Sequence, residues 1–440
     1  MLAPFHVRSF RFQWPADMST SWAFEMETLI LGWYVLVETR SVFMLTVFAS
    51  LLYVGTLLAP MFGVMGDRIG QRNLLCAMRS VYAACAIALM TFSFMGVITP
   101  MLVLAITAIV GLVRPSDIGM RAALVGETMP GDRLVGAMSI QRTTQDSARI
   151  AGALTGAGLF ATLGMGPAYA VVAAFYASSI LLTWQAGAAR AARQPAADAA
   201  RPRHTSAEGQ VSAAGAMTRS PQTAGSAGNE SARPSPWRDL REGLAYVWDT
   251  PHLRAAMLLA FLLNLTAFPL FTGLLPVVAK EVYLSDQTML GYMVAGAAFG
   301  ALLGSIFLSR FGHAVHPGRM MVVFSVAWYA MLMVFAHMPH PAAGIPALML
   351  AGFAQSLGLV PASAMLLRAS DQFRGRIMGI RMLAIYGNLP GLLASGPLIA
   401  GFGYPVTATL YCAIGIAFTL IIALYWREHL WRLDAPANKR

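Results

Sequence analysis

The sequence predicts an all-α, polytopic membrane protein with about twelve transmembrane helices in two six-helix bundles. Hydrophobic residues make up 57% of the 440 residues and charged residues only 12%, against about 25% charged in ordinary soluble domains. Apolar stretches of about 20 residues recur along the chain, and an α-helix needs this length to cross a hydrocarbon core about 30 Å thick. The mean hydropathy of +0.61 agrees with a chain whose solvent is largely lipid.

The apolar stretches give the expected helices in chain order. They cover residues 13–37, 42–65, 74–96, 100–120, 135–162, 166–187, 252–278, 288–309, 319–338, 345–367, 377–400 and 405–426. The first stretch is interpreted as a span and not as a removed signal peptide, because acidic residues lie within it and no small-residue cleavage site follows. The expected units are an N-terminal bundle (1–187), a linker (188–236), an interfacial helix (237–251) and a C-terminal bundle with a tail (252–440).

The segment between the two bundles differs in composition from the rest of the chain. Residues 188–236 are rich in Ala, Ser, Pro, Gly and Arg without apolar periodicity, which predicts a disordered cytoplasmic linker. Trp237, Leu240, Leu244 and Val247 then recur at helical spacing among charged residues. This pattern predicts an amphipathic helix along the membrane surface; the alternative is that the segment extends the next span inward.

The two halves of the chain resemble each other at an offset of about 240 residues, which indicates a duplicated six-helix unit. The matched positions are Gly66–Gly70 with Leu308–Gly312, Pro115 with Pro361, and Arg121 with Arg368. Such a duplication places a substrate cavity between the halves, near the middle of the bilayer.

The distribution of charge argues against a nucleic-acid-binding protein, although the net charge is +11 and the pI is 9.9. With the N-terminus inside, the outward loops contain only Arg40 and Lys280 as positive residues. This bias predicts a multi-pass protein of the inner or plasma membrane with both termini in the cytoplasm. The 3 cysteines lie in apolar stretches, so neither disulfides nor a metal site is expected.

The loop between the second and third spans carries a specific motif, "GVMGDRIGQR". It resembles the Gly-x-x-x-Asp-Arg-x-Gly-x-Arg motif of the major facilitator superfamily, and the resemblance covers the chain outside the linker. The matching positions are Gly63, Asp67, Arg68, Gly70 and Arg72. The segments "DLREGLAYVWDTPHLR" and "FRGRIMGI" further resemble the branch that contains macrolide-efflux proteins and the enterobactin exporter.

Membership of this family implies alternating access, in which two bundles rock about a central site. By resemblance, Asp67 faces Arg374 and Arg376 at the inner end of span 11 and latches the cytoplasmic side when the protein is open outward. The second half has Ser309 in place of the acid, so the latch is expected to be asymmetric. The resemblance also favours Arg114, because an arginine in span 4 is expected in proton-coupled members.

Ionisable groups within spans are costly in a bilayer, so each is a functional candidate. In span 1, Asp17, Ser21, Glu25, Thr28 and Gly32 form one polar stripe that we expect to face the cavity. Glu25 lies near mid-membrane, where desolvation favours proton uptake, and it is the first candidate for proton coupling.

The other acids of span 1 have different expected roles. Glu27 lies about 200° round the helix from Glu25, and it either takes the coupling role itself or is a packed structural acid. Asp17 lies near the inner end, where it is expected to reach water or to pair with an arginine.

Spans 4 and 5 carry further charges. Arg142, Asp146 and Arg149 share one face of span 5, so the acid can pair with either arginine. Arg114 and Asp117 lie one turn apart in span 4. These groups are interpreted as mutually neutralising pairs that hold helices together, or alternatively as a proton relay or contacts for an anionic substrate.

The predicted function is secondary transport: proton-coupled export of an amphipathic small molecule such as a drug or siderophore. The alternatives are a lysophospholipid or metabolite carrier, and a transport-inactive membrane sensor or scaffold. We expect no enzyme activity, because no nucleophile and base come together in the sequence, and no cofactor, because no phosphate-binding loop is present. The expected partners are the substrate, protons and the lipid bilayer, with the chain acting as a monomer.

Overall fold

The computed structural model describes residues 3–191, 245–311, 316–367 and 384–431, and every regular element in these ranges is a helix. The N-terminal half contains α1 (Arg8–Thr39), α2 (Val42–Leu51), α3 (Ala59–Ile69), α4 (Gln71–Phe94), α5 (Pro100–Thr128), α6 (Gly131–Leu163) and α7 (Met165–Ala191). The C-terminal half contains α10 (Pro251–Phe268), α11 (Leu275–Val277), α12 (Gln287–Phe311), α13 (Pro317–Ala336), α14 (Pro341–Leu367), α16 (Asn388–Phe402), α17 (Tyr404–Tyr425) and α18 (Arg427–Trp431).

Each expected span has a helical counterpart, and the expected fold class is confirmed. Among the described residues, 8 helices are long and apolar enough to cross a membrane. The remaining spans do not meet that criterion of length and apolar composition. The helices α1 and α6 carry many of the buried charges, the second span is broken, and α16 is only 15 residues long beside a range outside the description.

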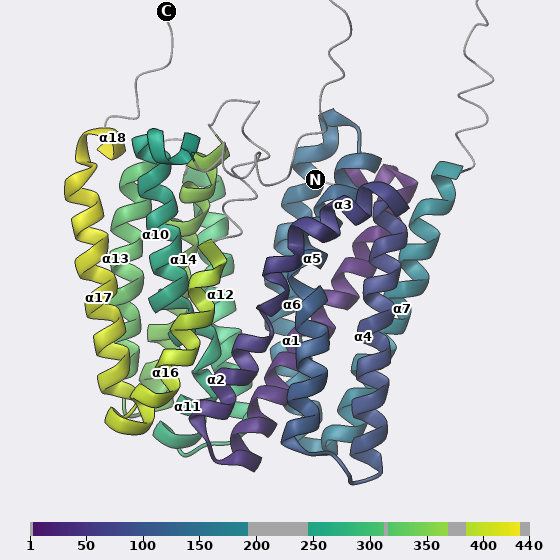
Figure 1. Cartoon of the computed structure of the whole chain (residues 1–440), viewed down its shortest axis with the longest axis horizontal. Coiled ribbons are helices and arrows are strands. Elements are labelled where there is room, and N and C mark those ends of the chain that lie inside the picture. The colour runs from purple at the N-terminus through teal and green to yellow at the C-terminus, as the bar shows by residue number, and fades with distance from the viewer. Residues whose placement is uncertain (1–2, 192–244, 312–315, 368–383, 432–440) are drawn as a thin grey trace, which may run out of the picture.

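The helices form two bundles that stand side by side in Figure 1, with α3 and α18 toward the upper end. The two halves contact each other mainly through α2 against α16 and α6 against α12. These two contacts pair the second span with the eleventh and the fifth with the eighth. They are equivalent under the duplication that the sequence indicates, because spans 2 and 5 of one half correspond to spans 8 and 11 of the other.

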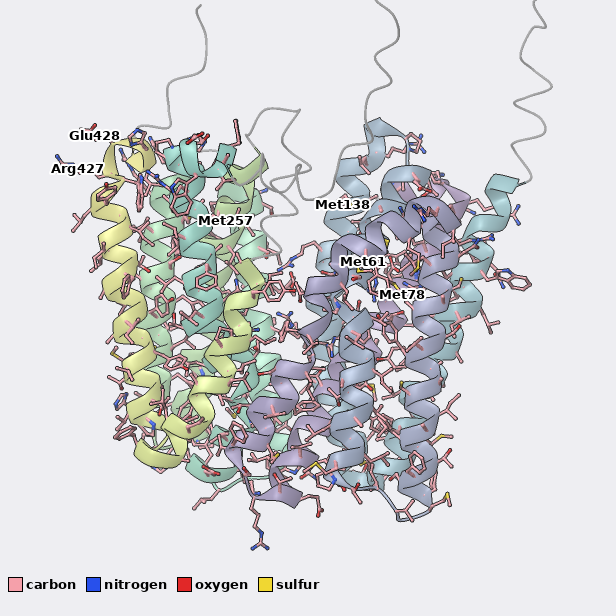
Figure 2. The ribbon with its side chains drawn as sticks, viewed as in Figure 1. Met61, Met78, Met138, Met257, Arg427 and Glu428 are labelled. Carbon is pink, nitrogen blue, oxygen red and sulfur yellow. The ribbon has the colours of Figure 1, made fainter. Side chains whose placement is uncertain are left out.

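The contacts between the halves lie toward one end, which we call the distal end because it is opposite α3 and α18. There Gly396 of α16 lies against Thr46 of α2, and Gly291 of α12 lies against Ala157 of α6. Figure 1 shows α2 leaning across to the other bundle at this end. Figure 2 places Arg427 and Glu428 at the opposite end, near the C-terminus.

Two spans are not continuous α-helices. The second is interrupted by the 3-10 segment η2 (Val54–Leu58), where Gly55 packs against the backbone carbonyl of Leu112 so closely that a Cβ would overlap it. The seventh contains two π-helical turns, η3 (Pro269–Gly273) and η4 (Val278–Val282), on either side of α11. Proline removes a backbone donor and disturbs the helix ladder, and the first of these turns begins at one.

The segments outside the two bundles are only partly described. The helix α7 continues to Ala191, past the expected start of the linker at 188, and the rest of the linker lies outside the described residues. Of the expected interfacial helix, residues 245–249 are helical, and Val247 is buried. The chain bends at Thr250 before α10 begins at Pro251, so this segment is not a straight extension of the seventh span.

Candidate functional site

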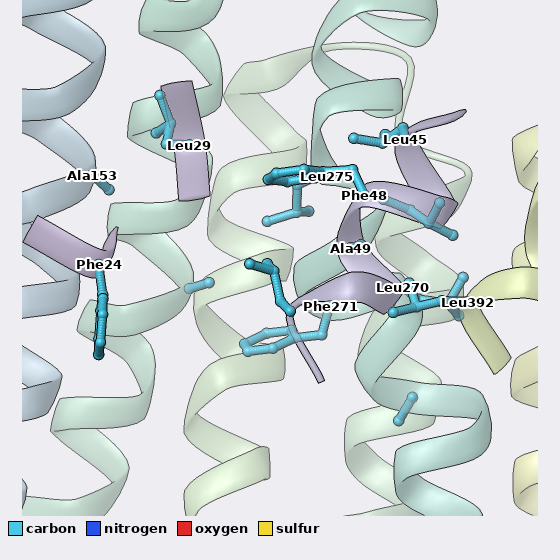
Figure 3. Close-up of a cluster of buried hydrophobic side chains, with 14 of the residues drawn as sticks. Phe24, Leu29, Leu45, Phe48, Ala49, Ala153, Leu270, Phe271, Leu275 and Leu392 are labelled. Atoms are coloured by element: carbon cyan, nitrogen blue, oxygen red, sulfur yellow. The ribbon is translucent and has the colours of Figure 1, made fainter. Parts of the chain in front are cut away.

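A cavity lies between the two halves, near the middle of the spans. Glu25, Thr28 and Leu29 of α1 and Arg149 of α6 form its N-terminal wall. The opposite wall comes from the seventh span and α12, and its lining residues are Phe271, Thr272, Leu275, Pro276, Leu290, Val294 and Ala297. Figure 3 shows Leu29, Phe271 and Leu275 within this apolar surround.

A second cavity continues the first toward the distal end, and Thr28, Thr272 and Pro276 line both. Leu45, Phe48 and Leu392 close it, in the region where α2 meets α16. Figure 3 shows Leu45 and Phe48 on α2 and Leu392 on α16. The cavity therefore ends in a packed apolar plug between the halves at the distal end.

The charged part of the cavity is the pair formed by Glu25 and Arg149. The Arg149 Nε atom donates to Glu25 Oε1 at 3.4 Å, and the two side chains are 35% and 24% exposed. The close approach of α1 and α6 sets this geometry, because a Cβ at Gly152 would lie 2.8 Å from Glu25 Cβ. Trp22 Nε1 donates to Thr155 Oγ1 at 2.8 Å across the same interface. Both partners are thus held on rigid helices yet remain accessible from the cavity.

Glu27 lies on the other side of α1, inside the N-terminal bundle, and is 3% exposed. The Tyr176 hydroxyl donates to Glu27 Oε2 at 2.8 Å. A protonated carboxyl could keep this contact with the donor and acceptor reversed, so the geometry accommodates both protonation states. Arg114 interacts electrostatically with Glu27, while its own hydrogen bond goes to Thr28 Oγ1 at 2.9 Å.

A buried ionic network lies further from the cavity, around the N-terminal half of α1. Asp17 pairs with Arg79 of α4, accepts from Gln141 Nε2 at 2.9 Å, and lies 3.8 Å from Arg121 Nε. Arg121 in turn pairs with Asp117 of the same helix. All four charged side chains are at most 5% exposed. Two acids and two arginines balance each other, which satisfies the requirement that buried charges be paired.

These contacts correct two expectations from the sequence. Arg114 and Asp117 do not form the expected pair, because Asp117 contacts Arg121 one turn further along α5 and Arg114 points toward α1. The polar stripe of α1 faces the cavity only in part. Thr28 lines it, whereas Asp17 lies in the buried network and the Ser21 hydroxyl accepts from Arg121 at 2.7 Å.

The three charged residues of span 5 form two separate ion pairs. Asp146, which is buried, lies 3.5 Å from the Nε atom of the exposed Arg142, and Arg149 turns to Glu25. The sequence left Asp146 able to pair with either arginine, because the three residues share a helix face. Only the packing of α1 against α6 reveals Glu25 as the partner of Arg149.

The loop motif forms the junction between α3 and α4. Gly63 and Asp67 lie in α3, and Gly70 has a φ of +88°, a conformation that glycine adopts without steric cost. Arg68 is exposed, and Arg72 donates to the side chain of Asn73 at 3.1 Å. Arg374 and Arg376, the expected partners of Asp67, lie outside the described residues, so the latch stays a prediction.

Sequence reasoning missed Arg79, Gln141 and Tyr176. Arg79 lies within the third expected span, where the sequence indicated no role for it, and its burial against a span 62 positions away in the chain has no local signal. Tyr176 is one aromatic residue in an apolar helix until α1 and α7 are packed together. In the described part of the chain, no group of three His, Cys, Asp or Glu side chains could hold a metal ion.

The comparison with family models identifies one family. The sequence profile of the Major Facilitator Superfamily matches residues 18–394. No curated protein sequence matches the chain. Among solved structures, the POT family transporter PepTSo covers 97% of this chain and 99% of its own, with a TM-score of 0.69 and 14% identity.

Two further structures show the same arrangement of helices. The nucleoside transporter NupG covers 97% of this chain and 99% of its own, with a TM-score of 0.65 and 12% identity. A bacterial homologue of the human lysosomal transporter Spinster, described as inward-facing and unoccupied, covers 96% and 97%, with a TM-score of 0.66 and 11% identity. Identities this low establish a shared fold and leave the substrate open.

Proposed function

Because the chain belongs to the major facilitator superfamily, we propose that it exports an amphipathic small molecule, such as a drug or siderophore, in exchange for protons. The cavity between the halves is the proposed substrate site. One wall is almost wholly apolar and the other carries a charged pair, and this combination suits a molecule with one apolar and one polar part. The resemblance to the macrolide-efflux and enterobactin-exporter branch supports the same class.

The observation that carries the proposal is the position of Glu25. It lies near the middle of α1, lines the cavity, and is held by one long contact to Arg149. A carboxylate in this place can bind either a proton or a substrate group, but not both at once. Competition of that kind is what an exchange of protons for substrate requires.

Glu27 is the alternative proton site. Its burial against Tyr176 isolates it from the cavity, so a proton there would act on substrate through Arg114 and Thr28 and not by direct contact. We assign Glu25 the coupling role and Glu27 a supporting role within the N-terminal bundle. Arg149 and Arg114 are proposed to balance the charge of these two acids, while Asp117, Arg142 and Asp146 are proposed to belong to neutralising pairs within the bundle.

We also propose that the described conformation is open toward the termini. The contacts that join the halves are concentrated at the distal end, where Lys280 Nζ donates to the backbone carbonyl of Leu36 at 3.0 Å. The positive-inside bias assigns the termini to the cytoplasm, so this conformation is inward-facing. The opposite state then needs a cytoplasmic latch, and Asp67 with Arg374 and Arg376 is the proposed one.

Transport in proteoliposomes with an imposed pH gradient tests the proposal. We expect an amphipathic substrate to move against its gradient when protons flow, and Glu25→Gln to reduce this flux at least about tenfold. Glu38→Gln is the matched control, an exposed glutamate near the end of the same helix that should keep wild-type flux. Proton-driven flux that survives in Glu25→Gln and fails in Glu27→Gln would move the coupling role to Glu27.

A further inference from the structure

The cavity holds one acid and one base, and both come from the N-terminal half. The facing wall contributes only apolar side chains and the hydroxyl of Thr272. A substrate with a charged group must therefore place it beside Glu25 or Arg149 and its apolar body against the opposite wall. The sign of the substrate's charge depends on whether Glu25 or Arg149 can exchange its present partner for another.

Arg149 has a second acid within reach. Asp146 lies one turn earlier on α6, is 2% exposed, and interacts electrostatically with Arg149. Its Oδ2 atom accepts no hydrogen bond among the described residues, and its ion-pair partner there is Arg142, at 3.5 Å and with a side chain 61% exposed. Asp146 is thus a buried carboxylate with unused acceptor capacity, one helical turn from the arginine of the cavity.

Glu25 has no comparable second base. Among the described residues, Arg149 is the cation within 4.0 Å of its carboxylate, and the contact uses only Nε at 3.4 Å. Arg–carboxylate pairs are strongest when two parallel hydrogen bonds form, so this single long bond is easily exchanged. If Arg149 moves away, Glu25 needs a cation from the cavity.

We propose that the cavity takes a cationic amphiphile, an organic ammonium or guanidinium on an apolar body, and that Arg149 moves from Glu25 to Asp146 when the cation binds. Glu25, Arg149 and Asp146 are then each paired before and after binding: the substrate replaces Arg149 on Glu25, and Arg149 joins Asp146. The exposed Arg142 gives up its ion pair with Asp146. An anion on Arg149 would instead leave Glu25 without a partner. This inference rests on the proposed function only in taking this cavity as the substrate site.

Equilibrium binding to the protein in lipid nanodiscs tests the sign of the charge without transport. Three probes share a phenylbutyl body and differ in the head: trimethylammonium, carboxylate, and the zwitterionic dimethylglycine group. After subtraction of binding to empty nanodiscs, we expect the ammonium probe to bind at least about tenfold more tightly than the other two. Glu25→Gln should remove that preference, and Glu38→Gln should retain it.

The exchange of partners is tested by a double-mutant cycle on Arg149 and Asp146. Asp146→Asn should weaken ammonium binding about fivefold to tenfold, because Arg149 then has no second acid. Arg149→Gln should strengthen binding, and Asp146→Asn should have no further effect in that background. Asp146→Glu keeps the charge and should restore binding, which separates this role from damage to folding.

Tighter binding of the carboxylate or zwitterionic probe would overturn the inference. So would an effect of Asp146→Asn that persists when Arg149 is Gln. Ammonium binding with the expected cycle but without proton-driven flux supports the inference and contradicts the proposed function. Proton-driven export of an anion would support the proposed function and contradict the inference.

Discussion

The buried network around Asp17 allows a quantitative test of how charge is held inside the N-terminal bundle. Replacing Arg79 with Gln keeps much of the side-chain volume and the possibility of a hydrogen bond to Thr183. It removes the cation that pairs with Asp17 at a site where both side chains are at most 5% exposed. The network then holds two carboxylates and one guanidinium, so its net charge changes from zero to minus one.

The expected loss of stability follows from this imbalance. Breaking a buried pair by removing one partner costs about 3–5 kcal/mol, because the remaining charge stays buried. Asp17 would still accept from Gln141 at 2.9 Å and lie 3.8 Å from Arg121 Nε, so the lower part of that range applies. The double variant Asp17→Asn/Arg79→Gln is neutral again and should regain at least about half of the loss.

Unfolding in mixed micelles of rising SDS fraction measures this difference, with a thiol-reactive dye as the probe. Cys85 and Cys412 are buried, so they react when their helices open. The reasoning is refuted if Arg79→Gln loses less than about 1 kcal/mol, which is the value of an exposed ion pair. It is equally refuted if the double variant is less stable than the single one.

Three further predictions concern gating and coupling. Asp67→Asn should impair transport cycles in proteoliposomes far more than Ser309→Ala, because only the first half carries the acid of the latch; equal tolerance would make the loop an ordinary turn. Lys280→Met should shift the equilibrium toward opening of the distal end about tenfold, because it removes the hydrogen bond to the Leu36 carbonyl, worth about 1.5 kcal/mol. Spin-label distances across that end would measure the shift. Glu27→Gln and Tyr176→Phe should have similar effects on proton-driven flux, because the two side chains are hydrogen-bonded to each other. Different effects would show that the two side chains have separate roles.

The sequence alone predicted the helices well because their signal is local. Lipid requires each span to be long, apolar and internally hydrogen-bonded, and that requirement is visible in a window of about 20 residues. The breaks in the second and seventh spans were not predicted. Pro269 marks one of them, but the 3-10 segment at Gly55 depends on its contact with α5 and has no comparable local signal.

The candidate site was predicted in composition but not in its pairing. Helical periodicity placed Asp17 and Glu25 on one stripe, and the structure keeps that geometry while dividing the stripe between a buried network and the cavity. The division depends on where the two bundles separate, which is a tertiary property. The partners of Arg114 and Arg149 could not be predicted for the same reason. Both arginines lie on other helices and contact side chains of α1.

The distribution of charge between the halves bears on how such a transporter could couple two solutes. The helices α14, α16 and α17 contain no Asp, Glu, Lys or Arg, while the buried Asp, Glu and Arg side chains of the described chain lie in α1, α4, α5 and α6. A rocking motion changes which end of the cavity is open. The described C-terminal wall of the cavity has no charged side chain, so this motion brings no further charge to Glu25 and Arg149 from that wall. Among the described residues that line the cavity, the charged groups that protonation or substrate binding could change therefore lie in the N-terminal bundle, which touches the C-terminal bundle mainly at α6–α12 and α2–α16. If Glu25 couples protons to substrate as proposed, a duplicated architecture keeps symmetric contacts for movement while the coupling acid lies in one half.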